Sequence, residues 1–427
     1  MDARTQQYRQ ARQDFFARYG ALWPGTVADP YDILEPIALP RAEIALLLQS
    51  AACLAAIYQR TAPLLRTLSD EALLELGLPP ATLKVVRCIL PGVADTVVGR
   101  FDLARTLDGY KLLEFNADTP GLVVETFSVN HTVCQEAGKV DPNEGGEQIL
   151  SEALRDAVRA GLKYVGTGEQ QRANIVVTAC GRYSRDAGIA GYLVKLLQQY
   201  DPMRTQYTPI EELSIDNNGL YDPQGKRIDV LLRVFPLQFF RNCLSWRGSS
   251  AQPIDTGAEA DCEEGLFNLL KRRRLAVINP PSAFLLESKA LQVVIWNLFE
   301  ERMYFNSSER LLIEKYMLPT YLDPPSAREP YVVKPTLGAE GDSVALVNPA
   351  LGSVRRALCT TYADQSMVYQ RYVELPEMEV LTELGPQVLQ MLTSCFVISG
   401  RPVGVCIRAG GAITDETAWV LPVCMAD

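Results

Sequence analysis

The chain has 427 residues and a mass of 47.2 kDa, a length that predicts about two to three domains. Its composition, 48% hydrophobic and 22% charged, is that of a globular protein and excludes a disordered, collagen-like or coiled-coil chain. The net charge of −10 argues against a nucleic-acid partner, because phosphate contacts require clustered lysine and arginine. With a single histidine, His131, a catalytic triad or a histidine-rich zinc site is not expected.

The ten cysteines are scattered and none forms a C-x-x-C pair, which argues against a disulfide scaffold, a zinc ribbon or a thioredoxin-type site. His131 and Cys134 lie three residues apart on an expected helix and could form a hydrolase pair. No third orienting group accompanies them, so we favour a buried thiol beside a surface histidine. The polar N-terminal segment and the absence of an 18-residue apolar run predict a cytoplasmic protein without a membrane partner.

Hydrophobic periodicity and turn residues predict a mixed fold, α+β or α/β, with helices and strands in layers. Helices are expected over 4–19, 41–67, 147–163, 189–197, 262–272 and 288–300. Strands are expected over 96–103, 110–118, 174–180, 331–334, 344–347, 367–374, 390–398 and 402–408, with a further hairpin over 219–234 and a linker over 326–330.

The strands on either side of Leu107-Asp-Gly109 carry an acidic cluster. A two-residue loop would pair residues whose numbers sum to 217 and place Asp102 opposite Phe115. A three-residue loop with a bulge at Gly109 would instead place Asp102 opposite Glu114, and we favour this register. Asp102, Glu114 and Asn116 would then form a hard-oxygen set suited to Mg²⁺. The alternative is an ordinary solvated hairpin in which Arg100 pairs with Glu114.

A second pattern predicts an anion site. Lys334 lies on a strand before a turn that carries Gly338 and Gly341, which lets backbone N–H groups approach phosphates. A plain β-hairpin reads the same way. Downstream, the strand over 367–374 can offer its backbone to an adenine and Glu374 to a ribose, although an edge strand has the same pattern. Arg408 ends an apolar strand beside glycines, where a buried guanidinium requires an anion.

Together these segments resemble the ATP-grasp synthetase module of glutathionylspermidine synthase and its stand-alone relatives. The resemblance runs from about residue 96 to the C-terminus. Its most specific element is the pair Arg-x-Asp and Glu-x-Asn followed by Ala-Asp-Thr-Pro. The residues that carry it are 100–102, 113–120, 287–291, 333–341, 369–376 and 404–408.

The resemblance implies an ATP-grasp fold with an N-terminal preATP-grasp-like region, and a ligase that joins a carboxylate and an amine at the expense of ATP. The domains implied are 1–170, with the metal-binding hairpin, 171–285 on the substrate side, and 286–427 for the nucleotide. The implied cofactors are ATP and Mg²⁺, the partners are small-molecule substrates, and a homodimer remains open. The implied roles are metal ligation by Asp102, Glu114 and Asn116, nucleotide binding by Lys289, Lys334, Gly338, Gly341, Gln370, Tyr372 and Glu374, catalysis by Arg100 and Arg408, and substrate contact by Thr119.

The chain departs from the family pattern in several places. It lacks the family's cysteine-type amidase domain, Ala339 stands where a basic residue is common, and Ser288 replaces a common asparagine. Pro120-Gly121 replaces a serine- and threonine-rich continuation. Two rival interpretations therefore stay open: a related ligase with another peptide or polyamine substrate pair, and an inactive ATP-grasp binding module. Arg233 and Arg241 would either meet an acidic substrate or pair with carboxylates of the chain.

Overall fold

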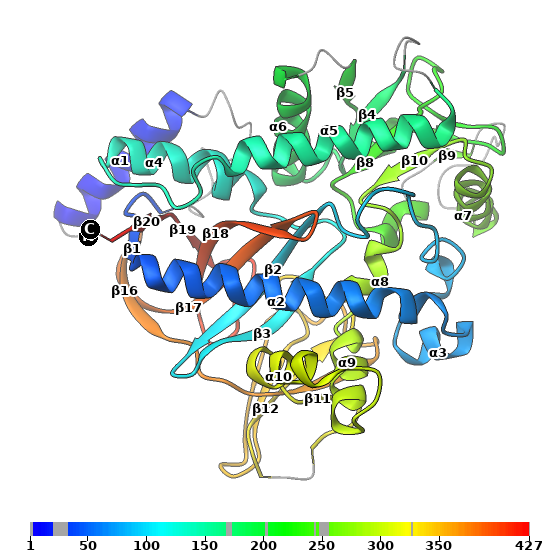
Figure 1. Cartoon of the computed structure of the whole chain (residues 1–427). Coiled ribbons are helices and arrows are strands. Elements are labelled where there is room, and N and C mark those ends of the chain that lie inside the picture. The colour runs from blue at the N-terminus through cyan, green and yellow to red at the C-terminus, as the bar shows by residue number, and fades with distance from the viewer. Residues whose placement is uncertain are drawn as a thin grey trace.

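A computed structural model of the chain describes residues 3–19, 33–167, 173–200, 204–242, 245–246, 256–325 and 328–426. The largest sheet has the strand order β19-β18-β17-β2-β3, with β16 paired to β17, and joins segments from both halves of the chain (Figure 1). A division at residues 170 and 285 would therefore cut across this sheet. Its strands are β2 (Val98–Thr106), β3 (Gly109–Asn116), β16 (Glu377–Thr382), β17 (Gly385–Ile398), β18 (Arg401–Gly410) and β19 (Trp419–Leu421).

Helix α2 (Arg41–Arg66) crosses one face of this sheet and determines which side chains of the hairpin are buried beneath it (Figure 1). The ring of Tyr58 meets Phe101 and Phe115 edge-on, at centroid distances of 5.5 and 5.0 Å. Phe101 and Phe115 are partners in the β2–β3 ladder and stack at 4.0 Å. Because side chains alternate across a strand, the polar residues on either side of these rings lie on the face away from α2.

A second sheet is wholly parallel, in the order β10-β8-β4-β5. Three of its strands, β4, β8 and β10, are short, buried and rich in Val, Ile and Leu, as expected for a sheet covered by helices. The hairpin expected over 219–234 forms only in its first part, where Tyr221 forms an antiparallel bridge with Arg227. Residues 230–233 do not belong to it, because they pair in parallel with β4 and β10. The elements here are β4 (Ile175–Thr178), β5 (Thr205–Tyr207), β8 (Val230–Arg233), β10 (Ala276–Ile278), and the helices α5 (Gly146–Val165), α6 (Ser184–Tyr200) and α7 (Thr256–Lys271).

A third sheet, in the order β11-β15-β12-β13-β14, carries the lysine and glycine loop and lies with α9 and α10 at the bottom of Figure 1. The helix expected over 288–300 begins only at Ala290, because Ser288 is extended (φ −62°, ψ 125°) and separates two helices. These elements are α8 (Ala283–Glu287), α9 (Ala290–Glu300), α10 (Ser307–Tyr316), β11 (Thr320–Tyr321), β12 (Tyr331–Pro335), β13 (Ala345–Asn348), β14 (Ser353–Arg356) and β15 (Met367–Arg371).

The remaining elements are small and peripheral to the site. Part of the expected linker, 326–327, lies outside the described residues. Two further sheets have the orders β1-β20 and β7-β6-β9. The elements are α1 (Ala3–Tyr19), β1 (Ile37–Leu39), α3 (Asp70–Glu75), a π-helical turn (Glu125–Val129) that leads into α4 (Asn130–Glu136), β6 (Ser214–Ile215), β7 (Leu220–Tyr221), β9 (Ser245–Trp246) and β20 (Val423–Met425).

Among the described residues, α2 is the one helix with the length and composition to cross a membrane. A core helix of a globular protein passes the same test, and α2 packs against β17, β18 and β3. Its buried positions include Leu47, Leu54 and Tyr58, which recur at helical spacing on the side facing the sheet.

Candidate functional site

The β2–β3 hairpin brings the predicted acidic residues together in the favoured register. Arg100 is opposite Asn116, and Asp102 is opposite Glu114. The reason given from the sequence is wrong, however. The turn is a two-residue loop that pairs Thr106 with Gly109, and the register shifts later, between Asp102 and Leu103. One extra residue on β3 at this point forms a bulge and restores the pairing at the site.

Arg100 and Asp102 form a buried ion pair within strand β2. The Nε of Arg100 donates to Asp102 Oδ1 at 2.7 Å, and its Nη2 donates to Oδ2 at 2.9 Å. Ser394 donates to Oδ1 and Asn116 to Oδ2, so both oxygens of Asp102 are engaged. Burial opposes the charge on Arg100, but the Asp102 carboxylate more than compensates and raises the guanidinium pKa. The solvated hairpin with an Arg100–Glu114 pair is therefore not what forms.

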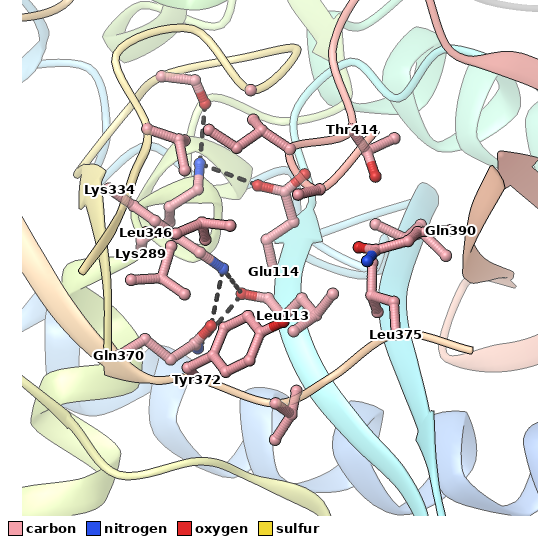
Figure 2. Close-up of a pocket in the computed structure, with 18 of the residues that line it drawn as sticks. Leu113, Glu114, Lys289, Lys334, Leu346, Gln370, Tyr372, Leu375, Gln390 and Thr414 are labelled. Carbon is pink, nitrogen blue, oxygen red and sulfur yellow. Dashed lines mark hydrogen bonds and ion pairs between the residues drawn. The ribbon is translucent and has the colours of Figure 1, made fainter. Parts of the chain in front are cut away.

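Glu114 pairs instead with Lys289, whose Nζ lies 3.1 Å from Oε2 (Figure 2). Burial disfavours the charged carboxylate, yet the ammonium groups of Lys289 and Lys334 outweigh it and lower the pKa of Glu114 to about 2. Glu114 is therefore ionised throughout the neutral range. Burial, reinforced by Lys289, lowers the pKa of Lys334 to about 8, while Glu114 limits the shift.

Leu113, the extra residue of the bulge, orients Lys334 through its backbone carbonyl. Lys334 Nζ donates to Leu113 O at 3.1 Å and to Gln370 Oε1 at 2.7 Å (Figure 2). Gln370 donates in turn to Gln292 at 2.8 Å, and both amides also reach the Leu113 carbonyl. Gln370, predicted to bind the nucleotide, is thus buried and orients Lys334. Neither Gln292 nor the bulge could be recognised in the sequence, because no motif marks them.

The loop between β12 and β13 requires its two glycines for different reasons. A Cβ on Gly338 would lie 2.2 Å from the Pro335 ring, and one on Gly341 would lie 2.6 Å from the carbonyl oxygen of Thr414. Gly341 also has a φ of +69°, which favours glycine. The acidic neighbour Asp342 is held by Thr361 N and Ser343 Oγ, and these hydrogen bonds overcome burial and lower its pKa.

A pocket opens between this loop, β3, β15 and the end of β18. Four cationic side chains, Lys289, Lys334, Arg371 and Arg408, line it against two carboxylates, so it is net positive in a chain of net charge −10. Aliphatic side chains form another part of its wall: Val332, Val344, Leu346, Leu375 and Leu392. A positive region beside an apolar wall suits a ligand with both an anionic and a flat apolar part.

Arg408 is the pocket residue whose surroundings most strongly favour a bound anion. It is 7% exposed, its Nη2 donates to the carbonyl of Asp415, and its buried Nε has no hydrogen-bond partner. No carboxylate of the described residues forms an ion pair with it. A buried guanidinium without a counter-ion is costly, so an anionic ligand is the natural partner.

The predicted residues divide between this pocket and its surroundings. Eight line the pocket: Glu114, Lys289, Lys334, Gly338, Gly341, Gln370, Tyr372 and Arg408. Arg100, Asp102 and Asn116 lie behind Glu114 on the same face, and Glu374 is exposed beyond the lining. Thr119 lines a separate small pocket with Asp118 and Arg233. Gln390 and Thr414, which also line the pocket that contains Lys289 and Lys334, were not recognised in the sequence.

The segment after the hairpin, residues 116–119, is held from several sides. Arg233 forms a buried bidentate pair with Asp118 at 3.0 and 2.5 Å, which settles its role in favour of pairing within the chain. Arg241 lies among residues whose side chains the structure does not describe. The amide of Asn279 donates to the carbonyls of Ala117 and Asp118, and Glu287 accepts from the N–H groups of the same two residues. Burial and the Asp118 carboxylate raise the pKa of Glu287 to about 7.

The predicted metal ligands fit magnesium in the chemistry of their donors, since all three present hard oxygens from neighbouring strands. Asp102 is the most constrained, because both of its oxygens already accept hydrogen bonds from Arg100, Ser394 and Asn116. Glu114 is bound through one oxygen to Lys289 and lines the pocket. Glu114 is thus the best placed member of the set.

His131 and Cys134 do not form a catalytic pair. His131 Nδ1 lies 3.3 Å from Asp141, whereas the Cys134 thiol donates to the carbonyl of Val423 at 3.2 Å. Burial and the nearby Asp141 carboxylate raise the pKa of Cys134 to about 12, so the thiol is un-ionised at neutral pH.

Comparison with known proteins decides the family. Residues 3–426 match the family described as glutathionylspermidine synthase preATP-grasp. The chain belongs to this family. It is 22% identical over 321 residues to the bifunctional glutathionylspermidine synthetase/amidase of Escherichia coli strain K12, and equally so to that of Shigella flexneri. These matches cover 73% of the chain and 46% of each relative, so the chain spans about half the length of the curated relatives.

A solved structure supports the fold. A glutathione synthetase-like effector from Globodera pallida, in its apo form, superimposes with a TM-score of 0.59 at 14% identity, over 100% of this chain and 98% of the other. The prediction of a mixed α and β fold related to ATP-grasp ligases is confirmed, as is the resemblance to the glutathionylspermidine synthase family. The family is one of ATP-dependent ligases that form carbon–nitrogen bonds.

Proposed function

We propose that the chain is an ATP- and Mg²⁺-dependent ligase that forms an amide from a small-molecule carboxylate and an amine. The observation that carries this proposal is the pocket in which Lys289, Lys334 and the unpaired Nε of Arg408 surround one space. Its aliphatic wall accepts the base, and its cationic side chains accept the phosphates. The relatives' name suggests a substrate pair of the glutathione and polyamine type, and a different peptide or amine is the alternative.

The reaction proposed has two steps. An oxygen of the substrate carboxylate attacks the γ-phosphorus, the bond from that phosphorus to the β-phosphate oxygen breaks, and ADP leaves. The amine nitrogen then attacks the acyl carbon, the bond from carbon to the phosphate oxygen breaks, and the amine proton is lost to solvent as phosphate departs. Phosphoryl transfer depends mainly on alignment and on charge neutralisation, which needs no histidine.

The residues of the chain divide these tasks. Lys289 and Lys334 bind phosphate oxygens, and Arg408 offers its free Nε to charge that develops during transfer. Arg100 contributes positive charge while Asp102 holds it in place. The loop of Gly338 and Gly341 covers the phosphates, Tyr372 and Glu374 lie on the side of the adenosine, and Thr119 contacts the carboxylate substrate.

Magnesium belongs with this nucleotide site. Glu114 and Asn116 are proposed as its main protein ligands, with Asp102 as a third. When bound, the ion neutralises phosphate charge and orients the phosphates. Glu114, with a pKa of about 2, is ready to bind it at any neutral pH.

The decisive test is ADP release from the purified chain with a panel of carboxylates and amines. We expect release that requires Mg²⁺, a carboxylate and an amine together. A thermal-shift titration with Mg·ATP provides the separate test of binding, because a ligand at 100 times its Kd stabilises a protein by about 2.7 kcal/mol. A chain that shows no shift with Mg·ATP would be the inactive binding module.

The pH dependence of nucleotide binding follows from Lys334. Its pKa of about 8 means that the ammonium is present below pH 8 and is lost above it, so a phosphate contact is lost as the pH rises. We expect the Kd for ATP to rise between pH 7.5 and 9.5, by at most about tenfold per unit above pH 8. Equilibrium binding measures this directly. Lys334→Met should bind more weakly, with a flat profile over that range; an equally steep profile in the variant would assign the titration to another group.

A further inference from the structure

A short segment between α8 and α9, Glu287-Ser288-Lys289, touches three parts of the site at once. Oε2 of Glu287 accepts from the N–H groups of Ala117 and Asp118 at 2.5 and 2.9 Å. Two residues later, Lys289 Nζ lies 3.1 Å from Glu114 and donates to the carbonyl of Gly338 at 2.8 Å. The segment therefore connects the end of the β2–β3 hairpin with the glycine loop, the loop between β12 and β13 that carries Gly338 and Gly341.

The break in the helix at Ser288 makes this bridge a backbone connection as well. In an unbroken helix the N–H of Lys289 would bond to a carbonyl four residues earlier. Here it donates to the carbonyl of Thr336, at the start of the glycine loop, at 2.8 Å. Ser288 is buried and its hydroxyl reaches the carbonyl of Leu76 at 3.4 Å, so the break itself is fixed by packing.

At the Glu287 end, the segment holds the backbone of Ala117 and Asp118. These two residues lie between a proposed metal ligand and a proposed substrate contact. Asn116 lies just before Ala117-Asp118 and Thr119 just after. Glu287 accepts hydrogen bonds from both N–H groups of this pair. The side-chain amide of Asn279 donates to both of its carbonyls, at 3.0 and 2.8 Å. A change in the position of Glu287 would therefore move Asn116 and Thr119 together.

The two ends of the segment, Lys289 and Glu287, differ in their position relative to the pocket. Lys289 lines the pocket, and one of its hydrogen bonds is to a loop carbonyl that an arriving phosphate can replace. Glu287 does not line the pocket, and among the residues that the structure describes its hydrogen bonds are to the N–H groups of Ala117 and Asp118. The segment thus contacts the loop of Gly338 and Gly341 through Lys289 and the end of the hairpin through Glu287.

We propose that Glu287 is a positioning residue, which through the 287–289 segment couples closure of the glycine loop over the nucleotide to the placement of Asn116 and Thr119. The inference rests on the proposed function. It goes beyond it by assigning a role to a residue that lies outside the lining of the pocket. When Lys289 turns to phosphate, its backbone stays bound to Thr336, so the loop and the hairpin end settle as one unit.

The test compares Glu287→Ala and Glu287→Gln with a matched control, Glu264→Gln, an exposed glutamate on α7 that pairs with Lys84. Three quantities are measured: the Kd for Mg·ATP, kcat and KM for the carboxylate, and hydrogen exchange of the amides of 117 and 118 with and without Mg·ATP. The exchange experiment reports on the site independently of activity. Thermal unfolding of each variant verifies that it is folded at the assay temperature.

We expect Glu287→Ala to keep the Kd for Mg·ATP within about threefold, since both lysines remain, and to lose about 10- to 100-fold in kcat, the usual cost of removing a supporting hydrogen bond. Exchange at 117 and 118 should rise and no longer respond to nucleotide. Glu287→Gln keeps an acceptor oxygen and should be intermediate, and Glu264→Gln should match wild type.

Two results would overturn the inference. One is a folded Glu287→Ala variant with wild-type kcat. The other is nucleotide-dependent protection at 117 and 118 that persists without Glu287. Failure of the proposed function itself looks different, because wild type would then bind no Mg·ATP and release no ADP, whereas a wrong inference leaves both intact.

Discussion

Replacing Arg408 with alanine should reduce kcat by about 10²- to 10³-fold, the cost typical of removing one preorganised donor from a phosphoryl or oxyanion site. The side chain is 7% exposed, and its Nε points to no partner in the protein. It lies within β18, paired to Leu392 and Val420, so the backbone on both sides fixes its position. Steady-state ADP release gives kcat, and the Kd for ATP should rise less than kcat falls.

Two matched variants make this result specific. Arg401→Ala removes an exposed arginine from the same strand and should leave kcat unchanged. Arg408→Lys keeps a charge but loses the planar guanidinium, so we expect it to recover only part of the rate. If Arg408→Ala is folded and keeps kcat within twofold of wild type, Arg408 has no part in transfer and the orphaned Nε needs another explanation.

The sequence predicted the composition of the site better than the reasons for its geometry. Alternation along a strand is enough to place Arg100 and Asp102 on one face and Glu114 and Asn116 on one face. Their register was also correct, but it arises from a bulge at Leu113 and a two-residue turn. A bulge depends on how two strands pack against their neighbours, so local turn residues could not reveal it.

The parts of the site that pattern reasoning missed are those set by tertiary burial. The 230–233 segment looked like half of a hairpin because an antiparallel partner was close in sequence, yet it enters the parallel sheet between β4 and β10. The helix expected over 288–300 begins at Ala290 because Ser288 is extended, and the short helix α8 before it was not expected. Gln292 and Asn279 carry no motif, and they matter because they satisfy buried backbone groups brought together from far along the chain.

The same reasoning explains why some predicted residues changed role. Asp102 and Gln370 were predicted to contact metal and nucleotide, and the structure shows each bound to a cationic side chain of the site. A lone sequence cannot distinguish a residue that binds a ligand from one that orients the binder. Asp102 remains a proposed metal ligand. A metal ion bound there would have to compete with Arg100 for its carboxylate oxygens.

The largest expected effect on stability comes from the Arg233–Asp118 pair. Its side chains are 1% and 2% exposed, so replacing one partner leaves the other charge buried without compensation. We expect Asp118→Asn or Arg233→Met to reduce the free energy of unfolding by about 3–5 kcal/mol, as for other broken buried pairs. Urea denaturation of the full chain measures this, and the solvent-exposed pair Lys84–Glu264 is the control that should cost little when broken.

The double variant Asp118→Leu/Arg233→Met separates the value of the pair from the penalty of an orphaned charge. Removing both charges should restore a large part of the lost stability, because an apolar pair of similar volume has no desolvation cost. Recovery should be incomplete, since Asp118 also accepts from the N–H of Leu237 at 3.0 Å and Arg233 also donates to the carbonyl of Phe235 at 2.9 Å. Activity should not recover with stability, because these contacts hold the segment between Asn116 and Thr119. A double variant as unstable as the sum of the two single variants would mean that each residue acts through its backbone contacts and not through the ion pair.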